Sequence, residues 1–311
     1  MRKIQIALYD REGYMSCLLD YLCKKGHSML ETRLFSSLDM LKECAGAGKI
    51  DVLLAGEEVV EEIRELEEKI AKIMLLSEGN QVKEGAGYYL LFKYQSAQEI
   101  VKEVLEQIAE DDNIAFTKAF TTKRTVSFIG IYAPFGGSGV TEYALSMAER
   151  MAKQEKVLYV SLEQFHSLDF LQSAGEDKTS YRGMSEVVFY LKQRKEKLAL
   201  KLETVVTSKE GKDYIFAVED YRDLYTLKWE DICQFLEVLS QQTDYETVIF
   251  DIGYLSEAVL YLMEHCDKLY MPQAETKQQK SKESAFQRFL YRENRESMMQ
   301  SFQRIKGGGM E

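Results

Sequence analysis

The chain lacks the residue patterns of several protein classes. Its three histidines show no metal-ligand spacing, and its five cysteines form no CxxC pair and are odd in number. We therefore expect neither a zinc centre nor a disulfide framework. No stretch approaches the roughly 18 consecutive apolar residues of a membrane span. The first ten residues predict a strand and not the apolar segment of a signal peptide.

Positive charge is also scarce. The 51 Asp and Glu residues outnumber the 40 Lys and Arg residues, which gives a net charge of −11. This balance argues against broad binding to nucleic-acid backbones, and no helix-turn-helix motif or basic stripe stands out. A chain of 311 residues with 45% hydrophobic residues is long enough for two domains with sizeable cores. We expect a cytoplasmic protein that does not bind nucleic acid.

Apolar strands alternate with amphipathic helices in the N-terminal part. Five strands alternating with five helices in this part predict an α/β domain with a doubly wound parallel sheet, over residues 1–112. The predicted strands cover residues 4–9, 28–35, 51–55, 72–76 and 88–92, and the helices include 14–23, 38–44, 57–69 and 97–108.

This order resembles the receiver domain of response regulators. Receivers carry an acidic pair after the first strand, a phosphoacceptor aspartate at the end of the third, a Thr or Ser at the end of the fourth and a lysine at the end of the fifth. Asp10 with Glu12, Ser77 and Lys93 match three of these positions, whereas the phosphoacceptor position falls on Gly56. Because glycine has no carboxylate to phosphorylate, we predict a pseudo-receiver that serves as a docking surface.

The predicted helix over 57–69 is strongly acidic. Seven glutamates occupy its first twelve positions, while Val59, Val60, Ile63 and Leu66 supply an apolar face. Residues 1–112 carry 14 Lys and Arg against 22 Asp and Glu, so most of the chain's net negative charge lies in this part. The helix fits either a solvated face or an acidic surface for a partner.

Residues 113–124 form a predicted linker between this domain and a second one at 125–311. The linker contains neither proline nor glycine, which favours a partly ordered connector.

A glycine-rich loop at residues 133–142 has the sequence Ala-Pro-Phe-Gly-Gly-Ser-Gly-Val-Thr-Glu. It follows an apolar strand pattern and precedes a helical one, which is the context of a phosphate-binding loop. Its glycines allow successive backbone N–H groups to converge on phosphate oxygens. The candidate nucleotide-binding residues are Phe135, Gly136, Gly137, Ser138, Gly139, Val140, Thr141 and Glu142.

The loop and two later segments resemble the ParA/MinD group of P-loop ATPases, whose loop reads Lys-Gly-Gly-x-Gly-Lys-Thr. In that group the first lysine crosses a dimer interface and the second contacts the phosphates; here Phe135 and Val140 stand at these positions. The second motif carries an Asp-x-Asp pair, replaced by Ser161 and Glu163. The third motif is kept, with Asp251 at the end of an apolar strand where the family places its Mg²⁺-coordinating aspartate.

The resemblance implies a second doubly wound parallel-sheet domain with a degenerate catalytic site. Phosphoryl transfer needs positive charge at the γ-phosphate, so the missing lysines predict little or no hydrolysis, and Glu163 remains only a weak catalytic candidate. ATP binding stays open: Thr141 and Asp251 would hold Mg²⁺ if a nucleotide binds, whereas Glu142 opposes the phosphates. Phe135 fits either an apolar dimer contact or simple packing under the loop.

A pseudo-receiver joined to such a domain resembles the TadZ/CpaE proteins of Tad (Flp) pilus assembly. That resemblance implies a cytoplasmic homodimer at the inner face of the cell membrane or a pole, which recruits the pilus secretion machinery. It predicts a non-catalytic localisation and assembly scaffold. The alternatives are an active ParA/MinD-type partitioning ATPase and a response-regulator-like signalling protein.

The C-terminal segment 296–305 places Met298, Met299, Phe302 and Ile305 on roughly one helical face. A helix at a membrane surface and a helix packed on the sheet both fit this pattern. We expect the residues from Lys306 onward to be disordered.

Overall fold

The computed structural model describes residues 3–25, 30–79, 88–111, 114, 125–165, 183–193 and 197–306. The chain divides into two compact units, Met1–Ala119 and Phe120–Glu311. Both are α/β units built on parallel sheets, as the sequence predicts. The predicted linker over 113–124 lies outside the described residues except for Ile114, and so do residues 307–311.

The first unit holds a five-stranded parallel sheet in the order β2-β1-β3-β4-β5. This is the strand order of flavodoxin-like doubly wound folds. The strands are β1 (Ile4–Tyr9), β2 (Leu30–Phe35), β3 (Val52–Gly56), β4 (Lys72–Ser77) and β5 (Tyr89–Phe92). The helices are α1 (Tyr14–Lys25), α2 (Leu38–Gly46), α3 (Val60–Ile63) and α4 (Ala97–Glu110).

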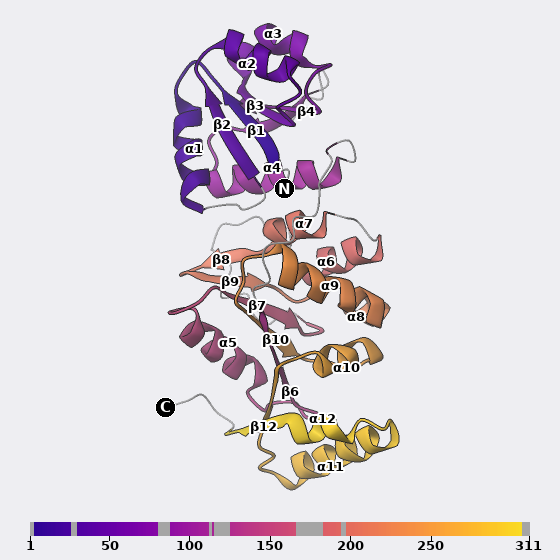
Figure 1. Cartoon of the computed structure of the whole chain (residues 1–311). Helices are drawn as coiled ribbons and strands as arrows, with labels where there is room; N and C mark the ends of the chain where they lie inside the picture. Colours follow the sequence, from indigo (N-terminus) through magenta and orange to yellow (C-terminus); the bar gives the residue numbers. More distant parts are fainter. Residues whose placement is uncertain are drawn as a thin grey trace. The chain divides into compact units, whose positions relative to one another are not determined.

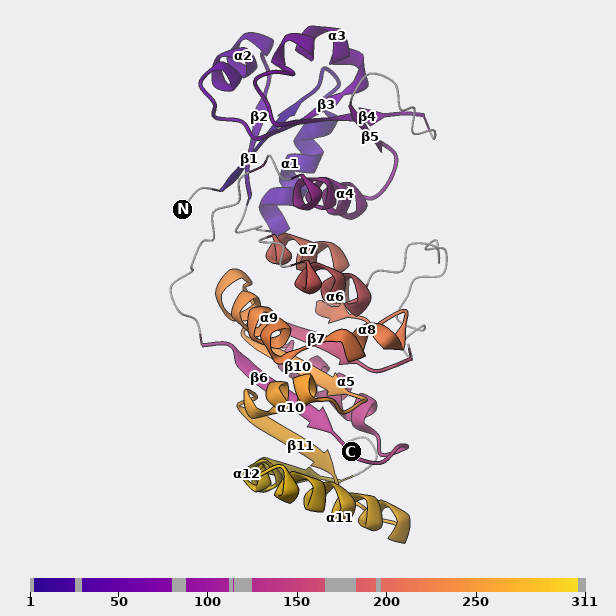
Figure 2. The ribbon, with the colours of Figure 1, turned by 90° about the vertical axis from the view of Figure 1, so that its right-hand side faces the viewer.

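Helices cover both faces of this sheet. Figures 1 and 2 show α1 and α4 on one face and α2 and α3 on the other. The central strand β3 is buried at every position, as expected for a parallel strand covered from both sides. Helix α4 begins where Ser96 Oγ accepts a hydrogen bond from the backbone N–H of Glu99 (3.2 Å).

The predicted acidic helix over 57–69 is wrong in extent. The structure has a single α-turn, α3, flanked by 3₁₀ turns at Glu57–Val59 and Arg64–Leu66. Adjacent β-branched residues and a run of like charges both weaken a continuous helix. The apolar face is nevertheless buried through Val59, Ile63 and Leu66. Residues 28 and 29 of the predicted strand 28–35 lie outside the described residues, as do residues 80–87 between β4 and β5.

The second unit holds a seven-stranded sheet in the order β12-β11-β6-β10-β7-β9-β8, in which only the β8–β9 pair is antiparallel. The strands are β6 (Ser127–Tyr132), β7 (Val157–Leu162), β8 (Thr207–Lys209), β9 (Lys212–Ile215), β10 (Thr247–Ile252), β11 (Lys268–Pro272) and β12 (Phe302–Ile305). The helices are α5 (Val140–Met151), α6 (Met184–Lys192), α7 (Leu198–Val205), α8 (Tyr221–Thr226), α9 (Trp229–Gln242), α10 (Glu257–Glu264), α11 (Lys277–Arg292) and α12 (Glu296–Ser301).

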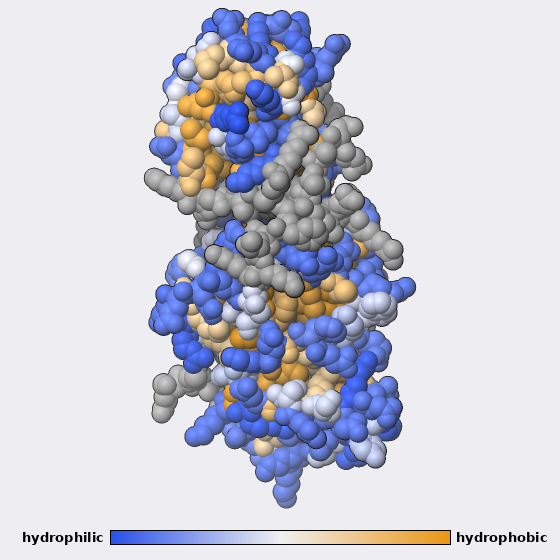
Figure 3. Space-filling view, viewed as in Figure 1, coloured by the Kyte–Doolittle hydropathy of each residue, from blue (hydrophilic) through white to orange (hydrophobic). Residues whose placement is uncertain are grey.

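Helices also cover both faces of the second sheet. Figure 1 shows α5 on one side and α6, α9 and α10 on the other, and Figure 2 shows α11 along the end of the unit that carries β11. In Figure 3 hydrophobic atoms show through between hydrophilic ones along the middle of this unit. None of the helices among the described residues is long and apolar enough to cross a membrane.

The strand connections place a crevice beside β6. From β6 the chain crosses through α5 to β7, on the β10 side, whereas from β10 it crosses through α10 to β11, on the opposite side. Ligands of open α/β sheets bind where the connections diverge in this way, at the carboxyl ends of the strands. The glycine-rich loop follows β6 at this point.

The predicted C-terminal helix over 296–305 is wrong in its second half. Helix α12 ends at Ser301, and Phe302–Ile305 form the edge strand β12, which pairs in parallel with β11. Met298 and Phe302 are buried, so the four apolar residues do not form one exposed helical face. An open strand edge at β11 provides hydrogen-bond partners that a short isolated helix lacks.

Candidate functional site

The glycine-rich loop turns directly from β6 into α5. Gly137 and Gly139 have φ values of +64° and +75°, which are left-handed and favour glycine. Gly139 is the N-cap residue of α5, and its carbonyl accepts the N–H of Tyr143 at 3.0 Å. Ser138 Oγ donates to the carbonyl of Phe135 at 3.2 Å and braces the turn. The free N–H groups at the start of α5 give the loop the geometry of an anion cradle.

A pocket of about 1050 Å³ opens over this loop. All eight candidate nucleotide-binding residues, Phe135 through Glu142, line it. The segment after β11 and the helix α11 also contribute to the lining. The charged lining residues are Glu142, Glu163, Glu275 and Lys282, so carboxylates outnumber the single ammonium among the described residues. The pocket has the shape for phosphates and an unfavourable charge for them.

Asp251 lies fully buried at the end of β10, beside this loop. Its register partners are Ile131 on β6 and Ser161 on β7, which places it at the carboxyl edge of the sheet. Tyr159 donates its hydroxyl to Asp251 Oδ2 at 2.6 Å, and Oδ1 has no hydrogen-bond partner. Burial raises the pKa of Asp251 to about 6. The Tyr159 bond opposes this shift, as does a weaker interaction with the Thr141 hydroxyl, whereas the charges of Glu163 and Glu142 add to it.

Glu163 lies just past the end of β7 and faces α5. The Thr141 hydroxyl donates to Glu163 Oε1 at 3.4 Å. Partial burial raises the pKa of Glu163, and the charge of Glu142 raises it further. A Cβ at Gly253 would lie 3.0 Å from Glu163 Cα, a tight contact that favours glycine where the ends of β7 and β10 meet. The weak catalytic candidate thus contacts the hydroxyl predicted to hold Mg²⁺.

These residues fit Mg²⁺ only together with a nucleotide. Among the described residues no group of three or more His, Cys, Asp or Glu side chains could hold a metal by itself. Mg²⁺ commonly binds through one or two carboxylates completed by phosphate oxygens. The unpartnered Oδ1 of Asp251 and the hydroxyl of Thr141 are the groups that would hold it here.

Phe135, at the position of the crossing lysine, is only 5% exposed. Its side chain packs within the unit, beside the loop whose pocket it lines. Of the two interpretations of Phe135, its burial favours packing under the loop.

The predicted receiver-like residues come together at the carboxyl edge of the first sheet. Asp10 follows β1, Gly56 ends β3, Ser77 ends β4 and Lys93 follows β5. Asp10 accepts the N–H groups of Gly13 (3.2 Å) and Met15 (2.9 Å), so its carboxylate caps the start of α1. Ser77 Oγ accepts the N–H of Gly79 at 3.1 Å.

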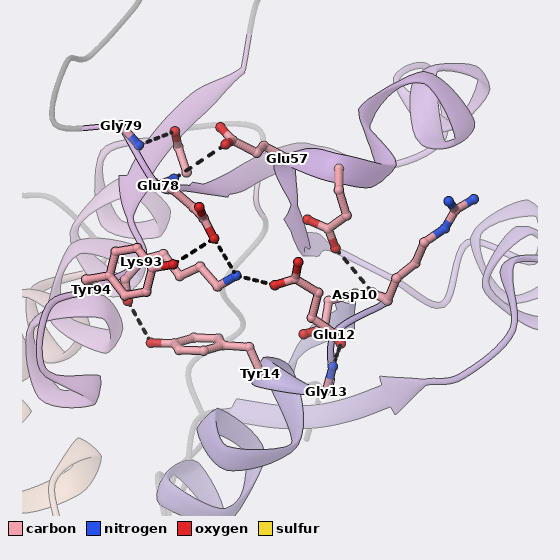
Figure 4. Close-up of polar contacts among 12 residues, drawn as sticks. Asp10, Glu12, Gly13, Tyr14, Glu57, Glu78, Gly79, Lys93 and Tyr94 are labelled. Atoms are coloured by element: carbon pink, nitrogen blue, oxygen red, sulfur yellow. Dashed lines mark hydrogen bonds and ion pairs between the residues drawn. The ribbon is translucent and has the colours of Figure 1, made fainter.

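Two glutamates hold the Lys93 ammonium in this cluster, as Figure 4 shows. Glu12 lies 2.5 Å and Glu78 lies 3.2 Å from Lys93 Nζ. The bond to Glu12, with the charges of both carboxylates, raises the pKa of Lys93. Tyr14 donates to the Lys93 carbonyl (2.9 Å) and Tyr94 to Glu78 (2.7 Å). These contacts connect the start of α1 to the ends of β4 and β5.

A carboxylate occupies the space above Gly56. Glu58 folds back so that a Cβ built on Gly56 would lie 2.1 Å from Glu58 Oε2, and Oε1 accepts the N–H of Arg11 at 3.2 Å. Glu58 lies two residues beyond the end of β3. Its side chain is exposed, yet its carboxylate lies over the phosphoacceptor position.

Sequence reasoning missed several residues of both sites. Tyr159 stands two positions before Ser161 on β7 and therefore points to the same face, a signal the strand period contained. Lys282 and Glu275 reach the loop from segments far along the chain, with no local signal. In the first unit Glu78, Tyr14 and Tyr94 join the predicted cluster.

No model of a known protein family matches the chain, and no curated protein matches it. Solved structures are similar in fold at low identity. A ParA family ATPase from Chlorobium tepidum is 17% identical, with a TM-score of 0.46 over 60% of this chain and 74% of that one. A plasmid partition protein from Borrelia burgdorferi is 16% identical, with a TM-score of 0.44 over 58% and 77% of the two chains. Cobyrinic acid a,c-diamide synthase from Mycobacterium smegmatis, solved with an ATP analogue and magnesium, is 16% identical, with a TM-score of 0.41 over 58% and 72%.

Proposed function

We propose that the chain is a non-catalytic localisation and assembly scaffold whose phosphate loop binds a nucleotide without turning it over. The observation that carries the proposal is a complete backbone cradle whose two lysine positions hold Phe135 and Val140. On the TadZ/CpaE resemblance, the scaffold acts as a cytoplasmic homodimer at the membrane or a pole. Its partners are proteins of the pilus secretion machinery.

The polar groups around the loop support binding over catalysis. Asp251 is held by Tyr159, and the Thr141 hydroxyl is directed to Glu163. Ser161 offers no carboxylate to position an attacking water. Hydrolysis depends on charge stabilisation at the transferred phosphoryl group, and the loop itself supplies no cation for it.

The first unit supports a docking role. Gly56 has no carboxylate, and the lysine of the cluster is already ion-paired with Glu12 and Glu78. A phosphoryl group at this position would therefore find the Lys93 ammonium already ion-paired, and it would lie close to the negative charge of Glu58. Transfer of label from an acyl-phosphate donor to the first unit would favour the signalling alternative instead.

Native mass spectrometry of the full chain, run beside an ATP turnover assay, tests the scaffold. We expect a dimer and turnover no faster than the buffer background, because the loop lacks both lysines. The Asp251→Ala variant serves as the control, because any ATP hydrolysis that occurs in this pocket should be lost in that variant. A monomer would contradict the scaffold, and turnover abolished by Asp251→Ala would establish the partitioning-ATPase alternative.

A functional fluorescent fusion tests the localisation. We expect a focal signal at the membrane or a pole, because a positioning scaffold must mark one place. Evenly distributed fluorescence from a fusion that still supports function would contradict it.

A further inference from the structure

We propose that Lys282 of α11 binds the phosphates of a nucleotide held by the loop, in place of the two missing loop lysines. This inference rests on the proposed nucleotide-binding function of the pocket. Among the described residues that line the pocket, Lys282 is the only one with a positive charge, and it comes from α11 and not from the loop or α5. The motif of the glycine-rich loop does not predict this lysine, because α11 lies far beyond the loop in the sequence.

The packing of α11 fixes where Lys282 lies. Phe286 packs on Tyr132, with ring centroids 5.3 Å apart, and Tyr132 is the last residue of β6 before the loop. Lys282 lies four residues before Phe286, so it occupies the same helix face one turn nearer the N-terminus. Gln279, three residues before Lys282, also lines the pocket. One face of α11 therefore runs from the base of the loop into the pocket.

The backbone on either side of Lys282 is held in place. Thr276 and Gln279 form a capping box, in which Gln279 Oε1 accepts the N–H groups of Thr276 (3.0 Å) and Glu275 (2.9 Å). Glu283, next to Lys282, pairs with Arg304 of β12 at 2.5 Å. The backbone that carries Lys282 is thus anchored to the sheet, while its side chain is exposed and has no ion pair among the described residues.

The charges in the pocket indicate which part of a nucleotide Lys282 would bind. Glu142, Glu163 and Glu275 also line the pocket, so a polyphosphate enters a site that is otherwise negative. The backbone cradle supplies partial positive charge, and a lysine on a flexible stem adds a full charge that can follow the phosphates. A nucleoside without phosphates gains nothing from this charge. Lys282 should therefore contribute more to binding as the number of phosphates rises.

Titration calorimetry of the full chain with adenosine, AMP, ADP and ATP, each with Mg²⁺, tests the assignment. We expect Lys282→Ala to weaken ATP binding roughly tenfold, which is the scale of one charge-assisted contact at a partly exposed site. The loss should shrink from ATP to AMP and vanish for adenosine. Lys282→Arg should keep most of the affinity, because the positive charge remains.

Lys280→Ala is the matched control. Lys280 is an exposed lysine on the same helix, two residues away and so on the opposite face, and it does not line the pocket. Equal ATP affinity in wild type and Lys282→Ala, or an equal loss in both lysine variants, would overturn the assignment. Absence of ATP binding by the wild-type chain would also overturn it, whereas a dimer in native mass spectrometry would leave the scaffold function standing.

Discussion

Asp251→Asn should stabilise the ligand-free second unit at pH 7.5. Asp251 is fully buried, and burial raises its pKa from the usual 3.8 to about 6. At neutral pH the folded chain therefore carries an ionised carboxylate that is fully buried. A pKa rise of this size corresponds to about 3 kcal/mol of lost folding free energy. Asparagine removes the charge and keeps an oxygen that can accept the Tyr159 hydroxyl.

The pH window follows from the direction of the shift. Between about pH 4 and pH 6 the folded chain holds a proton on Asp251 that the unfolded chain has released, so stability falls as the pH rises through this window. The advantage of Asp251→Asn should thus be complete above pH 6 and disappear near pH 4. Glu163, Glu142 and Thr141 are the other groups that act on this carboxyl.

Urea unfolding can be followed selectively in the second unit. The chain has one tryptophan, Trp229 at the start of α9, so its fluorescence reports that unit. Glu293→Gln, at an exposed acid past the end of α11, is the control for loss of one charge. A loss of stability in Asp251→Asn at pH 7.5 would mean that the carboxylate is already paired, contrary to its unpartnered Oδ1.

Tyr159→Phe should have the opposite effect at pH 7.5. It removes the donor to Asp251 Oδ2 and leaves a buried carboxylate without that bond, which costs about 2 to 3 kcal/mol. In the Asp251→Asn background the same change should cost less, because the remaining group is neutral. The difference between the two costs isolates the contribution of the charge.

The strands were predictable because they lie in parallel sheets. A strand buried on both faces, such as β3 or β10, is a continuous apolar run, and its end can be read to within a few residues. Asp10, Gly56, Ser77 and Lys93 were therefore placed at the carboxyl edge of the first sheet, where the structure brings them together. The glycine loop was predictable for the same reason.

The partners of the site residues were not predictable, because they depend on tertiary packing. Nothing local to Tyr159 says that its hydroxyl reaches Asp251 on the next strand. Lys282 lines the pocket because Phe286 seats α11 against Tyr132. Phe302–Ile305 form a strand because β11 offers an open edge, although their spacing with Met298 also fits a helix.

Val140→Lys should raise ATP affinity by roughly 30- to 100-fold, because it returns a cation to the phosphates inside an otherwise complete cradle. A charge-assisted contact of this kind contributes about 2 to 3 kcal/mol. Val140 is the first residue of α5 and packs, partly buried, against the core of the second unit, and the apolar stem of a lysine can replace part of this contact. Turnover should stay at background, because Ser161 still offers no carboxylate and Phe135 no second lysine.

The same variant tests whether two cations act on one set of phosphates. If Lys282 and a lysine at position 140 share the phosphates, Lys282→Ala should cost less affinity in the Val140→Lys background than in wild type. Calorimetry with ATP over the four chains of this double-mutant cycle measures the coupling. Strictly additive losses would place the two side chains on separate parts of the ligand. Unchanged affinity in Val140→Lys would mean that the loop does not face the phosphates, although Gly137 and Gly139 hold it in an anion-binding geometry.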